Sequence, residues 1–177
     1  MHKNIPNVLS VLRILLSFLF FMVQPFTAAF YFIYVFCGLS DVLDGLIARR
    51  FKLQSELGAA LDSVGDFAMI MIVMFRLYPY MDLKFHVYLW ILIILVLRFL
   101  ALVTGYIRFR VFAFLHTYAN KITGLLLFCF PVILPFTGID AASHLLCMAA
   151  TISACEELTI QLKSKALDRN VISIFKM

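Results

Sequence analysis

The sequence predicts an all-α protein, an integral membrane bundle of six transmembrane helices joined by short loops. Of its 177 residues, 64% are hydrophobic, and the mean hydropathy is +1.01, whereas soluble domains are only about half apolar. At ~20 residues per crossing, the chain is long enough for about six membrane helices. No internal repeat or linker interrupts the apolar runs, so we expect a single membrane domain over residues 1–177.

Each helix is predicted from an apolar run and from the residues that end it. Pro6 fits the first turn of a helix, and we expect turns at Pro25, at Pro79 and around Gly138. The first apolar run is too long for a cleaved signal peptide, and no small-residue cleavage site follows it. We expect helices at about 8–23, 27–47, 56–77, 85–106, 117–135 and from the turn at 137–140 to about 162.

Charges in the loops predict the orientation. Lys and Arg gather in the segments 49–52, 108–110 and 163–169, and the turns on the other side are poor in them apart from Arg76 and Lys84. Under the positive-inside rule, this pattern places both termini in the cytoplasm of a multi-pass plasma-membrane protein. A net charge of +5 could suggest a nucleic-acid partner. We reject that interpretation, because the basic residues lie at the ends of apolar segments, as in a membrane protein.

Four carboxylates lie beside or within apolar runs in the segment 41–66. Asp41 and Asp44 are three residues apart, and Asp62 and Asp66 are four apart, so each pair shares one helical face. Buried carboxylates are costly unless a cation lies between them. Oxygen-only ligands suit Mg²⁺, Mn²⁺ or Ca²⁺ rather than zinc or copper. We therefore predict a divalent-metal site between the two helices.

Residues with small side chains accompany both pairs. Gly45 and Ala48 complete the face of Asp41, and Gly58 stands one turn before Asp62. A bulky ligand can approach a helix closely where side chains are small. In the alternative interpretation these three residues only pack helices together, as small residues commonly do in membranes.

The chain resembles the CDP-alcohol phosphatidyltransferases in the signature that this segment carries. All eight signature positions match in type and spacing: Asp41-x-x-Asp44-Gly45-x-x-Ala48-Arg49, then eight residues, then Gly58-x-x-x-Asp62-x-x-x-Asp66. The segment 4–13 also resembles the opening of bacterial members of the family. The alternative is that the acids merely pair with Arg49 and Arg50.

The resemblance implies an enzyme of phospholipid biosynthesis, frequently a homodimer, that moves a phosphatidyl group from the membrane lipid CDP-diacylglycerol to a small hydroxylated acceptor and releases CMP. Displacing CMP requires charge neutralisation on two phosphates, which two bridged divalent ions supply. Asp41, Asp44 and Asp62 are our first choices as ligands of Mg²⁺ or Mn²⁺. The resemblance implies that Asp66 also lies near the metals and takes the proton of the acceptor hydroxyl.

The nucleotide has candidate contacts on three helices. A bidentate fork lets Arg49 reach a diphosphate, and the small residues leave room for the cytidine. On the first helix, Asn7, Ser10 and Arg13 stand at three-residue steps on one face. The alternative there is a helix cap and an Arg13 whose head group reaches the membrane surface. The nucleotide-binding residues that we expect are Gly45, Ala48, Arg49, Gly58 and, as a candidate, Asn7.

Three cations are candidates for binding an acceptor that carries its own phosphate. Arg98 lies about a dozen residues into an apolar helix, where a charge is costly, and Arg108 and Lys121 lie towards the same side of the membrane. Arg98 resembles an arginine of the family's phosphatidylglycerophosphate synthases, which usually follow it with Glu where this chain has Phe99. The alternatives are a salt bridge from Arg98 to one of the four aspartates and, for Arg108, plain positive-inside charge.

These cations make glycerol 3-phosphate the leading acceptor, with phosphatidylglycerol phosphate as the product. Inositol phosphate, serine and phosphatidylglycerol, the last as in a cardiolipin synthase, stay open. A cation transporter would need acids near mid-membrane, whereas these acids cluster at one end beside Gly and Arg, which favours an enzyme. We expect Glu156 and Glu157 to pair with Lys163 or with loop arginines rather than to act in catalysis.

Overall fold

The computed structural model describes residues 5–50, 56–110 and 117–164, except for the side chains of residues 5–10, 42, 44, 45, 47–50, 56–61 and 63. These residues form helices and no strand, which confirms the all-α class. Two compact units, Met1–Met81 and Asp82–Met177, are each considered by themselves. The single domain stays a prediction. The elements are α1 (Ile5–Ser17), η2 (Phe18–Phe21), α2 (Ala28–Arg50), α3 (Glu56–Leu77), η3 (Tyr78–Tyr80), α4 (Phe85–Phe109) and α5 (Tyr118–Lys163).

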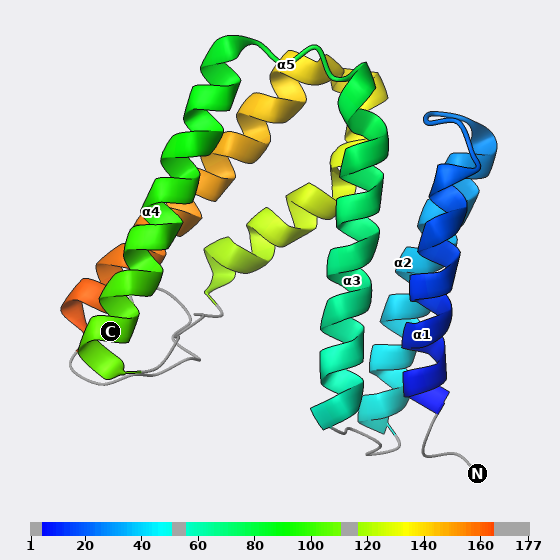
Figure 1. The fold of residues 1–177 in the computed structure, drawn as a ribbon, viewed down its shortest axis with the longest axis horizontal. Helices are drawn as coiled ribbons and strands as arrows, with labels where there is room; N and C mark the ends of the chain where they lie inside the picture. Colours follow the sequence, from blue (N-terminus) through cyan, green and yellow to red (C-terminus); the bar gives the residue numbers. More distant parts are fainter. Residues whose placement is uncertain (1–4, 51–55, 111–116, 165–177) are drawn as a thin grey trace. The chain divides into compact units, whose positions relative to one another are not determined.

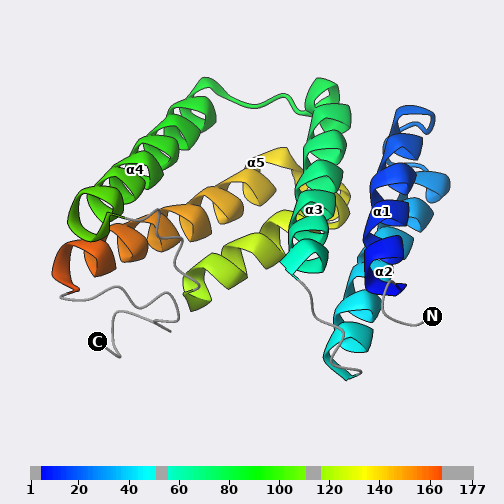
Figure 2. The ribbon, with the colours of Figure 1, turned by 60° about the horizontal axis from the view of Figure 1, so that its bottom comes forward.

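In the first unit, α1 packs against both α2 and α3, and the three helices lie side by side in Figures 1 and 2. Buried aromatic side chains hold α2 to the 3₁₀ helix η2, which follows α1. The ring of Phe20 lies 5.1 Å from that of Phe30 and 6.3 Å from that of Tyr34, between ring centres. Such edge-to-face pairs add to the large apolar area that the rings bury. The buried hydrophobic side chains of the described part of α3 are Met69, Val73 and Leu77.

The end of the first helix differs from the sequence prediction. The helix expected over 8–23 ends as α1 at Ser17, and the chain continues as the 3₁₀ helix η2. Arg76, in the last turn of α3, donates hydrogen bonds to the carbonyl oxygens of Phe20 (2.9 Å) and Val23 (2.8 Å). Carbonyl groups at a helix end have no partner within the helix, so Arg76 satisfies them from the neighbouring helix.

In the second unit, α4 packs against α5 and runs alongside its carboxyl-terminal part, orange in Figures 1 and 2. Val87, Ile94 and Cys147 form the buried core between the two helices, and Trp90 packs against it. The indole N–H of Trp90 donates a hydrogen bond of 2.9 Å to Thr151 Oγ1. Trp90 is partly buried. Its polar N–H has a partner, as indole groups away from water commonly do, and this hydrogen bond joins α4 to α5.

The long helix α5 bends where the sequence predicts a turn. Gly138 has φ 75° and ψ 165° inside the helix, a backbone conformation that residues with a side chain avoid. This finding confirms the turn expected at 137–140, and Figure 1 shows the change of direction in the yellow part of the ribbon. Pro131 and Pro135 precede the bend.

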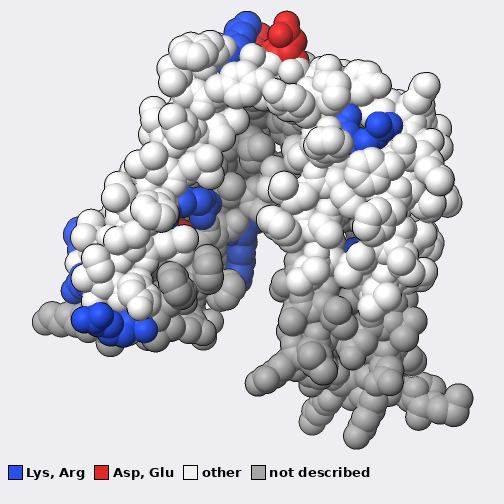
Figure 3. Space-filling view, in the orientation of Figure 1, with Lys and Arg blue, Asp and Glu red and all other residues white. Residues whose placement is uncertain are grey.

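The helices of the second unit have the character of membrane spans. Among the described residues, α4 and α5 are long and apolar enough to cross a membrane, with mean hydropathies of 2.6 and 2.1 over an 18-residue stretch of each. Val11–Phe21 and Ala28–Asp41 are shorter apolar helices. Figure 3 shows residues other than Lys, Arg, Asp and Glu over most of the visible face of the second unit, with charged residues near its ends and a few basic ones part-way along it. These features indicate a membrane protein, whereas the six crossings and the orientation stay predictions. The charged residues near the two ends of the second unit are the pair Lys84–Asp140 at one end and Arg108, Arg110 and Lys163 at the other.

Candidate metal centre

Three of the four predicted carboxylates meet in the first unit. Asp41 comes from α2, and Asp62 and Asp66 come from successive turns of α3. One carboxylate oxygen of each residue lies within 4.8 Å of the other two. The helical spacing alone predicts the Asp62–Asp66 pair, whereas Asp41 reaches it because α2 and α3 both pack against α1.

A buried arginine joins the three carboxylates. Arg13 of α1 has no exposed surface. Its Nη1 lies 2.9 Å from Asp41 Oδ1 and 3.2 Å from Asp62 Oδ1, and it also donates to Asp66 Oδ1. The alternative interpretation, in which the head group of Arg13 reaches the membrane surface, is therefore wrong, because the guanidinium lies inside the unit. The fold buries this charge next to three opposite charges, which is the arrangement that a buried guanidinium requires.

The donor set fits a divalent cation. The three carboxylates and the one guanidinium leave two negative charges, and all three candidate donors are oxygens. Carboxylate oxygens are the ligands that Mg²⁺ and Mn²⁺ prefer. The three acids are 39%, 41% and 42% exposed, whereas Arg13 is fully buried. An ion can therefore reach the oxygens from the exposed side of the cluster.

The remaining metal and nucleotide candidates have side chains outside the described residues. Their roles stay predictions, and so does an ion pair between the acids and Arg49 or Arg50. The arginine that the described residues place against the acids is Arg13. The undescribed candidates are Asp44, Gly45, Ala48 and Arg49 on α2, Gly58 on α3 and Asn7 on α1.

Arg98 belongs to a polar cluster inside the second unit. Its Nη1 donates to Glu157 Oε2 at 3.3 Å, and its Nη2 donates to Asn120 Oδ1 at 3.1 Å and to Ser153 Oγ at 3.3 Å. Glu157 is only 6% exposed, whereas Arg98 is 35% exposed. The expected pairing of Glu157 with Lys163 or a loop arginine is thus wrong, because the packing of α4 on α5 turns Glu157 towards Arg98. Within the described residues, the carboxylate partner of Arg98 is Glu157 and not an aspartate.

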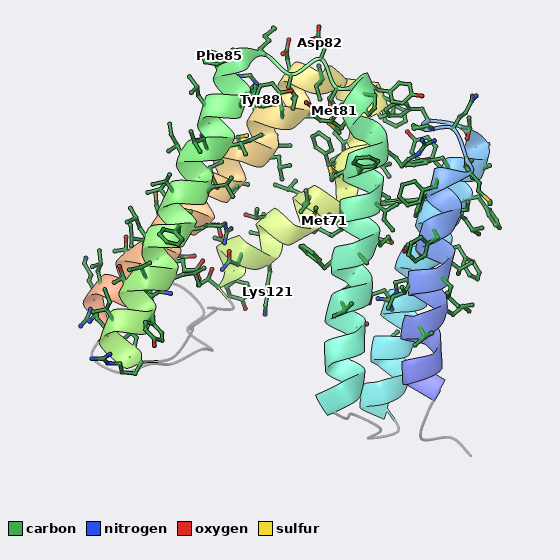
Figure 4. All side chains as sticks on the ribbon, in the orientation of Figure 1. Met71, Met81, Asp82, Phe85, Tyr88 and Lys121 are labelled. Atoms are coloured by element: carbon green, nitrogen blue, oxygen red, sulfur yellow. The ribbon has the colours of Figure 1, made fainter. Side chains whose placement is uncertain are left out.

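The other two acceptor candidates have different contacts. Arg108 Nη1 donates to the carbonyl oxygens of Gln161 (2.8 Å) and Leu162, near the carboxyl-terminal end of α5. Lys121 is exposed at the amino-terminal end of α5, as Figure 4 shows, with Nζ 5.7 Å from the centre of the Tyr118 ring. The contacts that the structure describes therefore do not gather the three cations at one point.

Comparison with known proteins decides the family. The family model described as CDP-alcohol phosphatidyltransferase matches residues 3–155, a span that contains Arg13 and all four aspartates. The chain belongs to the CDP-alcohol phosphatidyltransferase family. The resemblance that the signature predicts is thereby confirmed. In a member of this family, the cluster of Asp41, Asp62 and Asp66 is the part of the signature that the structure brings together.

The curated relatives of this CDP-alcohol phosphatidyltransferase are named CDP-diacylglycerol–glycerol-3-phosphate 3-phosphatidyltransferase. The protein of Cereibacter sphaeroides is 36% identical over 81 residues, which cover 42% of this chain and 36% of the relative. The Pseudomonas fluorescens protein is 34% identical over 76 residues (40% and 39%), and that of Escherichia coli strain K12 is 35% identical over 83 residues (42% and 43%). The chain thus matches less than half the length of each relative. No solved structure matches it.

The sequence does not predict that Arg13 lies among the acids of the site. Its position on the face of Asn7 and Ser10 suggests either a nucleotide contact or a head group at the membrane surface, and neither of these is a contact with the acids. One signal was available: four acids in apolar surroundings need nearby positive charge, and Arg13 lies within the family-like segment 4–13. The contact itself depends on how α1 packs, which local spacing does not encode.

Proposed function

We propose that the protein is an enzyme that transfers a phosphatidyl group from CDP-diacylglycerol to a small hydroxylated acceptor and releases CMP. The convergence of Asp41, Asp62 and Asp66 in a chain of this family is the observation that carries the proposal. In the reaction, the acceptor oxygen attacks the phosphorus that bears the diacylglycerol. The bond from this phosphorus to the CMP oxygen breaks, and CMP leaves with the electron pair.

The four aspartates have two roles in this proposal: three hold metal, and one accepts a proton. Asp41, Asp44 and Asp62 hold a pair of divalent ions, Mg²⁺ or Mn²⁺. When bound, these ions neutralise charge on the attacked phosphoryl group and on the leaving phosphate. Asp66 receives the proton of the acceptor hydroxyl, which a carboxylate can do within hydrogen-bond reach. Its place beside Asp41 and Asp62 supports this role.

Residues of the signature and of the first helix bind the nucleotide in this proposal. The guanidinium of Arg49 binds the diphosphate through two parallel hydrogen bonds. The glycine and alanine positions leave room on α2 and α3 for the cytidine and its phosphates. The residues concerned are Gly45, Ala48, Arg49, Gly58 and Asn7.

Glycerol 3-phosphate is the acceptor that we propose. The printed names of the relatives support this choice. Arg98 supports it as well, because its partly exposed guanidinium could bind a phosphate with charge-assisted hydrogen bonds. Arg108 and Lys121 are additional candidates on the same unit. Inositol phosphate, serine and phosphatidylglycerol are the alternative acceptors.

The same proposal includes the membrane setting. The enzyme is a single domain that crosses the plasma membrane six times and forms a homodimer, with both termini and the metal centre on the cytoplasmic side. The basic loops support the orientation through the positive-inside rule. Family membership supports the membrane location and the dimer.

The proposed activity is tested by CMP release from CDP-diacylglycerol, with the protein purified in detergent. Glycerol 3-phosphate, inositol phosphate, serine and phosphatidylglycerol are supplied one at a time, and the lipid product is identified by mass. We expect CMP release with glycerol 3-phosphate and a product with the mass of phosphatidylglycerol phosphate. CMP release with another acceptor alone would correct the acceptor, and no CMP release with any of them would reject the activity.

Replacing Arg98 should raise the KM for the acceptor by about tenfold or more, because a hydrogen bond between two charged groups is lost. The KM for CDP-diacylglycerol should change little. Arg98→Ala alone would leave Glu157 buried without its partner, which is strongly destabilising. The kinetics are therefore measured on the double variant Arg98→Ala/Glu157→Gln and compared with Glu157→Gln. Equal losses for both substrates would show that Arg98 only stabilises the α4–α5 contact.

A further inference from the structure

The cation inside the carboxylate cluster belongs to the protein itself. A single nitrogen atom, Arg13 Nη1, contacts one oxygen from each of Asp41, Asp62 and Asp66. The same aspartates form the candidate metal group. The Arg13 side chain is fully buried, and each acid is about two-fifths exposed. The guanidinium thus neutralises the acids from the inner side, and an ion approaching from outside meets oxygens that already have a positive neighbour.

A cation at this point stabilises the metal-free cluster. Carboxylate oxygens within 4.8 Å of one another repel, and the repulsion grows as the surroundings become less polar than water. Of the helices that form the cluster, α1 brings the positive charge, whereas α2 and α3 bring the negative ones. The Arg13 contacts therefore also tie α1 to its two neighbours. Without them, the metal-free cluster would push α2 and α3 apart.

The same charge should oppose metal binding. Carboxylate oxygens approach Mg²⁺ to about 2.1 Å, whereas the Arg13 nitrogen lies 2.9 Å and 3.2 Å from the oxygens of Asp41 and Asp62. A metal ion at these oxygens thus has to draw them in and to share or replace their contacts with the guanidinium. A positive charge at this distance also repels a divalent cation.

We infer that Arg13 is a positioning residue, the resident counter-cation that holds Asp41, Asp62 and Asp66 together in the metal-free protein and weakens the binding of the divalent ion by competing for the same carboxylate oxygens. The part that concerns metal rests on the proposed function, whereas the part that concerns the metal-free protein does not. If Arg13 only filled space, replacing it would lower the stability of the protein equally with and without metal.

The test compares Arg13→Gln with the charge-keeping Arg13→Lys, each purified in detergent. Thermal unfolding is followed in chelator and in saturating Mn²⁺, and the Mn²⁺ affinity is measured from the electron paramagnetic resonance signal of the free ion. In chelator, the Tm of Arg13→Gln should fall by about 5 °C or more. In Mn²⁺ most of this loss should be recovered, because the ion supplies the missing charge. The Mn²⁺ affinity of Arg13→Gln should rise about tenfold, and that of Arg13→Lys should change less.

Arg76→Gln is the matched control. Arg76 belongs to the same unit and also makes long-range contacts, but it donates to the backbone carbonyls of Phe20 and Val23 rather than to carboxylates. Its substitution should lower the Tm equally in chelator and in Mn²⁺ and should leave the Mn²⁺ affinity unchanged. If Arg13→Gln behaves in this way, binds Mn²⁺ more weakly, or folds in neither buffer, the inference is overturned.

A double variant tests the charge balance without metal. In chelator, Arg13→Gln/Asp66→Asn should unfold at a higher temperature than Arg13→Gln, because removing one carboxylate relieves the repulsion that Arg13 no longer offsets. An equal or lower Tm would reject the role of Arg13 in the metal-free protein. If the unsubstituted protein binds no Mn²⁺, the metal centre of the proposed function fails, and the double variant still decides this role.

Discussion

Replacing Asp66 by Asn should lower turnover by about 10²–10⁴-fold, which is the usual cost of losing a general base. An amide cannot accept the proton of the acceptor hydroxyl at neutral pH. Much of the binding of metal and CDP-diacylglycerol should remain, because Asp41 and Asp62 stay in place on α2 and α3. Asp41→Asn and Asp62→Asn should instead lower the metal affinity, since a neutral oxygen attracts a divalent ion less than a carboxylate does.

Separating these effects requires three measurements on each folded variant: metal affinity, binding of CDP-diacylglycerol and kcat. The control substitution is Asp140→Asn, which removes an exposed carboxylate that pairs with Lys84 in the second unit. It should leave the metal affinity unchanged. Normal turnover in Asp66→Asn would place the base elsewhere. If Asp66→Asn loses metal as fully as Asp41→Asn does, Asp66 is chiefly a ligand.

Removing divalent metal should abolish CMP release. The two negative charges left in the cluster cannot stabilise the further negative charge of a diphosphate, so positive charge must come from bound ions. The protein is stripped with chelator, transferred to metal-free buffer and assayed before and after addition of Mg²⁺ or Mn²⁺. Either ion should restore the activity. Full CMP release by the stripped protein in excess chelator would rule out a metal-dependent reaction.

Most helix positions follow from the local sequence. The prediction of a helix over 56–77 is confirmed by α3, and α4 begins at Phe85 as expected. It continues beyond the expected 106 to Phe109 and ends where Arg110 adopts a left-handed φ of 57°. Apolar runs and turn residues are sufficient signals for such bounds. The change from α1 to η2 lacks a local signal, because the stabilising Arg76 lies 53 residues beyond Val23 along the chain.

The site is less fully predictable than the helices. Spacing places Asp62 and Asp66 on one face of α3, but Arg13 lies 49 residues from Asp62 along the chain. Glu157 likewise lies 59 residues from Arg98. Both pairs form because a charge in apolar surroundings is stable only beside an opposite charge, and the fold decides which charges meet. The sequence therefore identifies the charged residues, whereas their pairing emerges only when the helices are packed.

Trp90 is the one tryptophan of the chain, so the tryptophan fluorescence of this protein reports on one position, at the contact between α4 and α5. Its N–H donates to Thr151 of α5, and its ring centre lies 5.6 Å from that of His144. Separation of α4 from α5 would break both contacts and shift the emission wavelength. Substitutions in the aspartate cluster of the first unit should leave these contacts intact, because both lie within the second unit. The chain thus carries its own optical probe, which distinguishes a variant with an altered site from one whose second unit has come apart.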